Sequence, residues 1–415
     1  MADDLLSRLR PATAEEWGPF RAAMSGAFGE TPTEPYLTTP PPVAELDRSL
    51  GLFEGDRVLA TSGIYSRTLT VPGAVVPCAA VTWVTVAPTV RRRGVLTEMM
   101  RRQLTDLHEQ EREPVAALWA SEWPIYGRFG YAPAAFRGGL TGRSERLRLR
   151  PDIDLGTGQV TLVDRETYQP AAAALHDAVR RFVPGNLDRD QRWWDRRLLD
   201  LPDQRDGATA LQFALHTETD GTVTGYAAWR MKGTWNDDTG EPDGTLIVEE
   251  VRASSTPAYA SLWKVLLSVD LVRRVQAPMA SPDDPLRHMV TDGRALASRP
   301  VDSLWVRLVD VGRALSARRY PAPIDFVLEV RDPFCAWNSG RWHLWGHPAG
   351  AFCDRTDRDP DLVLGIEELS AIYLGGVSLA ALQAAGRVTE VSPGAVTQAS
   401  TGFGWPVTPW CPDDF

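Results

Sequence analysis

The residues best suited to chemistry lie in one stretch, Val84 to Met100, which reads VTVAPTVRRRGVLTEMM. Three arginines and Gly94 stand between an apolar run and a segment with helical spacing. A helix N-terminus presents unpaired N–H groups and the positive end of the helix dipole, and a glycine lets a ligand approach the backbone closely. Arginines beside it add charge-assisted hydrogen bonds to phosphate oxygens. The stretch therefore predicts a site for a pyrophosphate group.

This site differs from two common nucleotide-binding motifs. Neither G-x-x-x-x-G-K-[ST] nor G-x-G-x-x-G occurs in the stretch. A solvated basic loop ahead of an ordinary helix is the alternative interpretation. The strand end beside the loop favours a ligand site, because Pro88 interrupts strand pairing and leaves main-chain groups that can bond the amides of a ligand.

The surrounding pattern predicts the elements that position this stretch. Short apolar runs from Ser49 to Val86 predict a meander of strands, and the run from Val115 to Trp119 predicts a buried strand. Helical spacing after the arginines predicts an amphipathic helix of about four turns whose first turn lies at Arg93 to Leu96. Near the N-terminus, Thr13 to Glu16 have capping-box spacing and open a helix. Residues 31–43 contain five prolines and predict a surface loop.

A central block repeats this order of elements, which indicates an internal duplication. The sequence predicts helices around 167–182 and from Leu262 to Val272, and strands around 209–216, 223–231 and 244–252. The nearest counterpart of the arginine stretch, Val248 to Ala258, has neither the arginine run nor the glycine. We therefore expect no second phosphate site, and we expect Glu249 and Glu250 to be charges at a strand edge.

The last block begins near Ser303 and has an α+β pattern. Half-buried strands are predicted at 304–308 and 324–330, and helices at 310–318 and 378–385. The tail from Gly404 to Phe415 holds three prolines and two tryptophans. A tail of this composition is stiff and apolar, so we expect it to be docked.

Composition narrows the class of protein. The chain of 415 residues predicts two or three domains. Its 54 acidic residues exceed the 44 basic ones, which disfavours nucleic acid as a partner and suits cationic substrates. No long apolar run and no signal-peptide pattern occur, so we expect a cytoplasmic protein without a membrane partner. The cysteines lack C-x-x-C spacing, and His343 and His347 lack a nearby third ligand, so we expect no metal.

A second stretch, Ser121 to Ala134 (SEWPIYGRFGYAPA), makes the pattern similar to a known family. A strand, a proline and R-x-x-G-x ahead of a helix resemble motif A of the GNAT N-acetyltransferases, whose ligand is acetyl-CoA. The two stretches together resemble the Eis family, the enhanced-intracellular-survival acetyltransferases of actinobacteria. The resemblance implies an α/β and α+β protein: two tandem GNAT-like α/β domains followed by an α+β domain like sterol carrier proteins. Over this chain they correspond to residues 1–150, to 151–300 without a CoA motif, and to 301–415 with the docked tail.

The resemblance also implies partners and individual roles. It implies a homohexamer that transfers acetyl groups from acetyl-CoA to one or several amines of a cationic small molecule such as an aminoglycoside. The pantetheine arm would be bound by Val84, Thr85 and Val86, and the pyrophosphate by Arg92, Arg93, Gly94, Val95, Leu96 and Thr97. Ser121 and Glu122 would line the acyl side of the cleft. In a ternary-complex mechanism, Tyr126 would be the general acid and the C-terminal carboxylate of Phe415 the general base.

The sequence departs from the family pattern at two points and leaves alternatives open. Leu96 stands where general GNAT sequences have Gly or Ala, although a bulky residue fits the Eis subgroup. Trp123-Pro124 replace small residues, which would alter the shape of the amine cleft. Spacing alone favours Tyr126 as a turn aromatic that packs on Phe129 and Tyr131, and only the family motif around it favours the catalytic role. A protein lysine is a second class of acceptor, and a lipid carrier that uses its C-terminal domain is an alternative to an enzyme.

Overall fold

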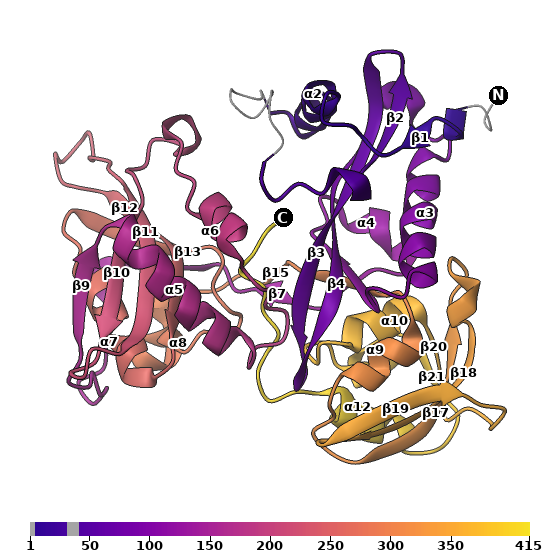
Figure 1. The fold of residues 1–415 in the computed structure, drawn as a ribbon. Coiled ribbons are helices and arrows are strands. Elements are labelled where there is room, and N and C mark those ends of the chain that lie inside the picture. Colours follow the sequence, from indigo (N-terminus) through magenta and orange to yellow (C-terminus); the bar gives the residue numbers. More distant parts are fainter. Residues whose placement is uncertain (1–4, 31–40) are drawn as a thin grey trace. The chain divides into compact units, whose positions relative to one another are not determined.

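A computed structural model describes residues 5–30 and 41–415 (Figure 1). By spatial contact the chain divides into two compact units. Unit 1 comprises Met1–Ala134, Leu304–Pro406 and Asp414–Phe415, and unit 2 comprises Ala135–Ser303 and Val407–Asp413. Most of the loop predicted at 31–43 lies outside the described residues. No helix in the described part of the chain is long and apolar enough to span a membrane.

The N-terminal part of unit 1 contains a seven-stranded sheet. Its strands, in spatial order, are β1 (Leu9–Arg10), β2 (Leu50–Glu54), β3 (Arg57–Val71), β4 (Ala74–Val86), β5 (Val115–Leu118), β16 (Trp305–Leu308) and β6 (Ala132–Pro133). Only β4 and β5 are parallel, and every other neighbouring pair is antiparallel. The predicted meander and the predicted buried strand at Val115 are therefore confirmed.

Strand β16 corrects one prediction. The alternating pattern at 304–308 predicts a half-buried strand, but all four residues of β16 are buried. The strand lies between β5 and β6 inside the N-terminal sheet. Arg307 is accommodated by an ion pair with Asp332, whose Oδ2 lies 2.6 Å from the guanidinium Nη2, and both side chains are fully buried. A charged residue in the pattern therefore marks a buried ion pair and not a solvent-facing side.

Two helices cover the N-terminal sheet, and a short one follows β5. They are α2 (Trp17–Phe28), α3 (Val95–Glu109) and α4 (Trp123–Tyr126). Met100, Leu104 and Leu107 of α3 pack in one cluster with residues of β4 and β5, which confirms the predicted amphipathic helix. The capping box ahead of α2 forms only in part: the carboxylate of Glu16 accepts a hydrogen bond from the N–H of Thr13 at 3.0 Å.

The C-terminal part of unit 1 has its own five-stranded sheet. Its strands, in spatial order, are β19 (Gly350–Arg355), β18 (Gly340–His347), β17 (Ile324–Arg331), β20 (Leu362–Gly365) and β21 (Val388–Glu390). The accompanying helices are α9 (Val311–Ala317), α10 (Ile366–Ile372), α11 (Leu379–Ala384) and α12 (Ala395–Phe403). The helices predicted at 310–318 and 378–385 are confirmed as α9 and α11.

Unit 2 contains a second seven-stranded sheet. Its strands, in spatial order, are β14 (Leu296–Ala297), β8 (Leu140–Arg143), β13 (Val272–Ala277), β12 (Gly244–Ala253), β11 (Val223–Lys232), β10 (Gln212–Thr217) and β9 (Gln159–Val163). Strands β15 (Val301–Asp302) and β7 (Phe136–Arg137) form a separate pair. The helices of this unit are α5 (Arg165–Arg180), α6 (Gln191–Arg197), α7 (Thr256–Leu266) and α8 (Leu286–Met289). Alternate residues of β11 pack in two different clusters, Tyr226 with α5 and Trp229 with α7, so these two helices cover opposite faces.

The helix predicted from Leu262 to Val272 is wrong in position. Helix α7 already ends at Leu266, and Val272 begins strand β13. Leu271 adopts a left-handed φ of 64° where the chain enters that strand. The apolar spacing runs on across this turn, so periodicity alone did not show where the helix stops.

Candidate active site

The candidate site lies where β4 and β5 separate. The two parallel strands pair only from Cys78 to Ala80, so β4 continues to Val86 without β5 beside it. The main-chain groups on that side of β4 therefore have no strand partner in β5. A ligand with amide groups can hydrogen-bond to such an edge as an added strand does.

A β-bulge bends β4 at this point. Across β3, Thr82 pairs with Gly63 and Thr85 pairs with Thr61, so one extra residue is inserted into β4. Trp83 adopts a left-handed φ of 57° in the bulge, and a Cβ at Gly63 would come within 2.5 Å of the Trp83 ring. The hydroxyl of Thr61 donates to the Trp83 carbonyl at 2.6 Å. Gly63 and Thr61 thus fix the direction in which the end of β4 runs.

The loop from β4 to α3 forms another wall. Arg91 Nε donates to the carbonyl of Val86 at 3.2 Å. Arg92 and Gly94 both have left-handed φ values, 61° and 82°, and for a residue with a side chain this conformation costs about 1 kcal/mol. Gly94 is the N-cap of α3 and supplies no side-chain cap. A Cβ placed on Gly94 has no atom within 4 Å, so the first turn of α3 adjoins open space.

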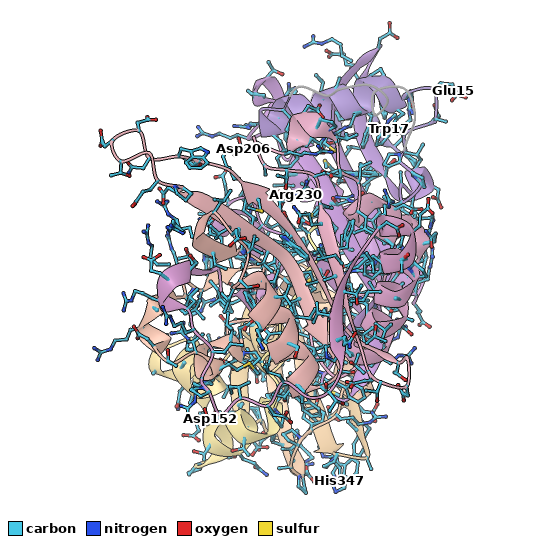
Figure 2. All side chains as sticks on the ribbon, turned by 90° about the vertical axis from the view of Figure 1, so that its left-hand side faces the viewer. Glu15, Trp17, Asp152, Asp206, Arg230 and His347 are labelled. Atoms are coloured by element: carbon cyan, nitrogen blue, oxygen red, sulfur yellow. The ribbon has the colours of Figure 1, made fainter. Side chains whose placement is uncertain are left out.

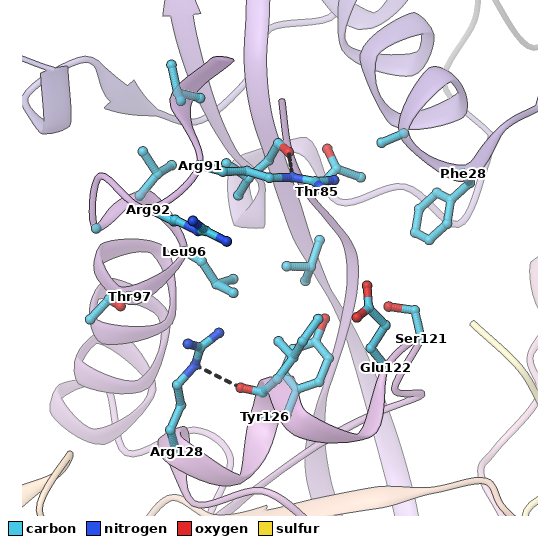
Figure 3. Close-up of a pocket in the computed structure, with 17 residues that line it drawn as sticks. Phe28, Thr85, Arg91, Arg92, Leu96, Thr97, Ser121, Glu122, Tyr126 and Arg128 are labelled. Atoms are coloured by element: carbon cyan, nitrogen blue, oxygen red, sulfur yellow. Dashed lines mark hydrogen bonds between the residues drawn. The ribbon is translucent and has the colours of Figure 1, made fainter. Parts of the chain in front are cut away.

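Between these walls lies a cavity of about 710 Å³. It is lined by Ala27, Phe28, Val84, Thr85, Val86, Val90, Arg91, Arg92, Gly94, Val95, Leu96, Thr97, Ser121, Glu122, Ile125, Tyr126 and Arg128. Figure 3 shows Arg92 on one side of the cavity and Glu122, Ser121 and Phe28 on the other. Strand β4, the start of α3, the end of α2 and the segment around α4 together build it.

The predicted site residues are not all among these lining residues. Arg93 is exposed and Phe415 is half-buried, and neither lines the cavity. Trp123 does not line it either: its ring is 58% exposed and packs edge-on against Trp305 at 5.1 Å between centroids. The other predicted ligand-binding residues and Tyr126 do line the cavity.

Sequence reasoning missed three side chains of the cavity that carry charge or a ring. Arg91 belongs to the same arginine run as Arg92, and that run was the available signal. Arg128 follows Tyr126 by two residues, and its Nε donates to the carbonyl of Ile125 at 3.0 Å. Phe28 is the last residue of α2, and it is 52% exposed and lines the cavity. The sequence pattern alone does not distinguish an apolar side chain that lines a cavity from one in the core.

Tyr126 both packs and lines the cavity. Its ring is only 5% exposed and meets Tyr131 edge-on at 6.1 Å between centroids. Burial, and secondly the charge of Glu122, raise the pKa of Tyr126 to about 12. The phenol therefore stays protonated at neutral pH, where it can donate a hydrogen bond.

The cavity is lined by both positively and negatively charged side chains. Arg91, Arg92 and Arg128 are its cationic side chains, and Glu122 is its carboxylate. Guanidinium groups beside an uncapped helix start suit a phosphate, whereas a carboxylate suits an ammonium group. No cluster of three or more His, Cys, Asp or Glu side chains in the described residues has the geometry to hold a metal ion. The cavity thus suits a molecule with a phosphate group, beside a second molecule with an amine.

Comparisons with known proteins agree with this geometry. Residues 8–134 and 185–308 each match an acetyltransferase (GNAT) domain, and residues 311–412 match a sterol carrier protein domain. The chain is 45% identical over 378 residues to an N-acetyltransferase of Streptomyces avermitilis, with 90% of each chain covered. It is 35% identical over 350 residues to the N-acetyltransferase Eis of Mycobacterium tuberculosis, with 81% of each chain covered. Eis1 from Mycobacterium abscessus has a similar crystal structure, with a TM-score of 0.84 at 32% identity over 98% of this chain and 100% of the other.

Proposed function

Because this chain belongs to the Eis family of GNAT N-acetyltransferases, we propose that it transfers acetyl groups from acetyl-CoA to amines of a cationic small molecule, such as an aminoglycoside. One observation carries the proposal. A single cavity has an uncapped helix start and arginines at one end, and a buried tyrosine with a carboxylate neighbour at the other. The first end fits a pyrophosphate and the second fits a reacting amine.

The donor is held by main-chain groups and arginines. The pyrophosphate of acetyl-CoA accepts hydrogen bonds from the first turn of α3 and from Arg92, with Arg91 beside it. The pantetheine arm lies along Val84 to Val86, where β4 has no partner in β5. Bound in this way, the arm directs the thioester toward Tyr126, which lines the same cavity.

The reaction moves one proton from nitrogen and one to sulfur. The acceptor nitrogen attacks the thioester carbonyl carbon, so a C–N bond forms and the C–S bond breaks. Tyr126 donates to the departing sulfur. Its pKa of about 12 lies well above the value of about 8.5 for a thiol, so complete proton transfer costs about 5 kcal/mol. The phenol therefore acts first as a hydrogen-bond donor while the C–S bond breaks.

The terminal carboxylate of Phe415 is the proposed base for the amine proton. This role rests on the family resemblance, since Phe415 does not line the cavity. An ordinary C-terminal carboxylate has a pKa of about 3.5 and is a weak base, so it needs a desolvated position to take up a proton. Deletion of Phe415 is expected to abolish acetylation and to leave acetyl-CoA affinity unchanged. Full activity of the deletion variant would exclude the base role.

A thiol-release assay tests the proposal as a whole. Acetyl-CoA is supplied first with kanamycin and then with lysine-bearing peptides, and mass spectrometry of the products counts the acetyl groups added. Release with kanamycin supports the small-molecule acceptor, and release with peptides alone supports a protein lysine acceptor. If neither releases CoA while the protein binds lipid, a carrier function replaces the enzymatic one. We also propose a homohexamer, to be tested by light scattering against the chain mass of 45.7 kDa.

A further inference from the structure

The sheet of unit 2 separates in the same way as the sheet of unit 1. Strands β12 and β13 are parallel and pair only from Gly244 to Ile247 on the β12 side. From Val248 to Ala253, β12 continues without β13 beside it. A bulge at Glu249 bends β12 in this part. The equivalent opening in unit 1 is the cavity described above.

In unit 2 this opening is filled by the C-terminal tail, Val407–Asp413. The guanidinium of Arg252, on β12, lies 4.3 Å from the centroid of the Trp410 ring. The Nε1 of Trp410 donates to the carbonyl of Met279 at 2.6 Å, two residues after β13 ends. Asn186 Nδ2 donates to the main-chain carbonyl of Trp410 at 2.5 Å. Trp410 is therefore held from β12 on one side and from the segment that follows β13 on the other.

A buried ion-pair network fastens the end of the tail. Arg189 Nε lies 2.7 Å from Oδ1 of Asp413, and Arg189 Nη1 lies 2.9 Å from Oε2 of Glu250. The three side chains are 1%, 7% and 2% exposed, in the order Arg189, Asp413 and Glu250. Burial alone would raise the pKa of Glu250, but the surrounding guanidinium groups hold it well below its usual range. Glu250 is thus a buried anchor, and its prediction as a strand-edge charge is wrong.

The start of α7 is not available to a phosphate as the start of α3 is. The hydroxyl of Ser255 accepts a hydrogen bond from the N–H of Ala258 at 3.3 Å, and Pro257 stands in the first turn. The loop between β12 and α7 is two residues long. The cap and the proline thus leave fewer free N–H groups at this helix start, and the opening beside it is occupied by Trp410.

We infer that the central GNAT-like sheet is the docking site for the chain's own C-terminus, and that Arg189 is a positioning residue for the terminal carboxylate. Phe415 follows Asp413 by two residues, a reach of about 7 Å at full extension. Fixing Asp413 therefore confines the carboxylate to a small region. The inference rests on the proposed base role of that carboxylate, and it gives the central domain a function in the reaction.

The test uses the full chain with Asp413→Asn, which keeps the side-chain shape and removes the charge. We expect carboxypeptidase Y to release Phe415 about tenfold faster, and kcat to fall about tenfold with the KM for acetyl-CoA unchanged, since the tail loses a charge-assisted anchor. Asp413→Glu retains the charge and is expected to recover part of kcat. The matched control is Asp152→Asn in the same unit, which removes the charge of Asp152 from its exposed pair with Arg150 at 2.9 Å. Figure 2 labels Asp152.

Two further measurements separate the outcomes. If Asp413→Asn and Arg189→Met keep wild-type kcat and wild-type resistance to carboxypeptidase, the inference is overturned. Acetyl-CoA binding, measured by calorimetry, shows whether unit 1 of each variant remains folded. Deletion of Phe415 is assayed in parallel. Full activity of that deletion with slow carboxypeptidase release in the wild type would refute the base role and the positioning role but keep the docking site.

Discussion

In unit 1, β4 separates from β5 beside a helix whose first turn has no side-chain cap, and a cavity remains. In unit 2, β12 separates from β13 beside a helix capped by Ser255, and Trp410 fills the opening. Both sheets use a bulge in the separating strand. The same backbone geometry therefore borders an open cavity in one unit and a peptide segment of the chain itself in the other.

The difference lies in a few polar groups and not in the sheets. Glu122 lines an open cavity in unit 1, whereas Glu250 is buried against arginines in unit 2. The loop ahead of α3 runs from Ala87 to Gly94 and includes the arginine run, whereas the loop ahead of α7 has two residues. Loop length and the cap decide whether the helix start is available for a ligand.

The largest expected effect comes from introducing a carboxylate side chain at the start of α3. In Gly94→Asp, the carboxylate would stand at the helix start, repel the pyrophosphate and force a side chain into a left-handed φ of 82°. We expect acetyl-CoA binding to weaken about 1000-fold, because several charge-assisted hydrogen bonds are lost together. Isothermal titration calorimetry with CoA measures this change.

The control for that change is an aspartate at the N-cap of the other helix. Ser255→Asp places a carboxylate at the N-cap of α7, where Ser255 already caps the helix with its side chain. Aspartate is also a favourable N-cap residue. CoA affinity is expected to remain at the wild-type value. A loss of affinity in Ser255→Asp would show that unit 2 also takes part in CoA binding.

The next largest effect tests the reacting end of the cavity. Tyr126→Phe removes the proposed donor to sulfur, so kcat is expected to fall about 100-fold with the KM for acetyl-CoA unchanged. Tyr131→Phe is the matched control, since the Tyr131 hydroxyl is buried and has no hydrogen-bond partner in the described residues. Its kcat is expected to stay within twofold of wild type. Equal losses in both variants would point to packing and not to proton donation.

Much of the unit 1 site was predictable from the sequence. The remainder could not be predicted, because it depends on contacts between residues that are far apart in the chain. The arginine run, Gly94 and the helical spacing that follows are local, so they predicted the start of α3 and most of the cavity. Trp123 looked like part of the cleft, but contact with Trp305 holds its ring elsewhere. Such contacts join residues far apart in the chain, so the local spacing of residues cannot predict them.

The ion pairs of unit 2 were missed for the same reason. Asp413 is 224 residues from Arg189, and Glu250 is buried in a strand where the sequence predicts a charge at an edge. The burial of Arg307 was missed in the same way, because its partner Asp332 lies 25 residues further along the chain, directly after β17. At both positions the sequence predicted a strand correctly but predicted an exposed charge where the side chain is buried.

A smaller effect is expected when the two glutamates of the comparison are neutralised. Glu122→Gln is expected to raise the KM for a cationic acceptor by up to about fivefold, because an exposed charge pair contributes up to about 1 kcal/mol. Glu122 also raises the pKa of Tyr126, so the substitution is expected to lower that pKa. Ultraviolet titration of the tyrosinate, with Tyr126→Phe as the blank, measures the shift.

The contrasting variant is Glu250→Gln, whose expected effect is on stability and on the tail. Glu250 is buried among guanidinium groups, so its neutralisation leaves buried positive charge without compensation. Its thermal midpoint should fall while the KM for the acceptor stays near the wild-type value in the folded protein. An acceptor KM that rises in Glu250→Gln and not in Glu122→Gln would reverse the assignment of the two carboxylates.

The smallest expected effect comes from removing the cap of α7. Ser255→Ala deletes the acceptor for the N–H of Ala258, and the loss of such a cap costs about 1 kcal/mol. Hydrogen exchange of the first turn of α7 is expected to become about fivefold faster, since local opening there costs less free energy. CoA affinity should not change, because Trp410 still fills the opening and no arginine run stands beside the helix. New CoA binding in this variant would mean that Ser255, and not the tail, keeps the second GNAT domain from acting as a cofactor site.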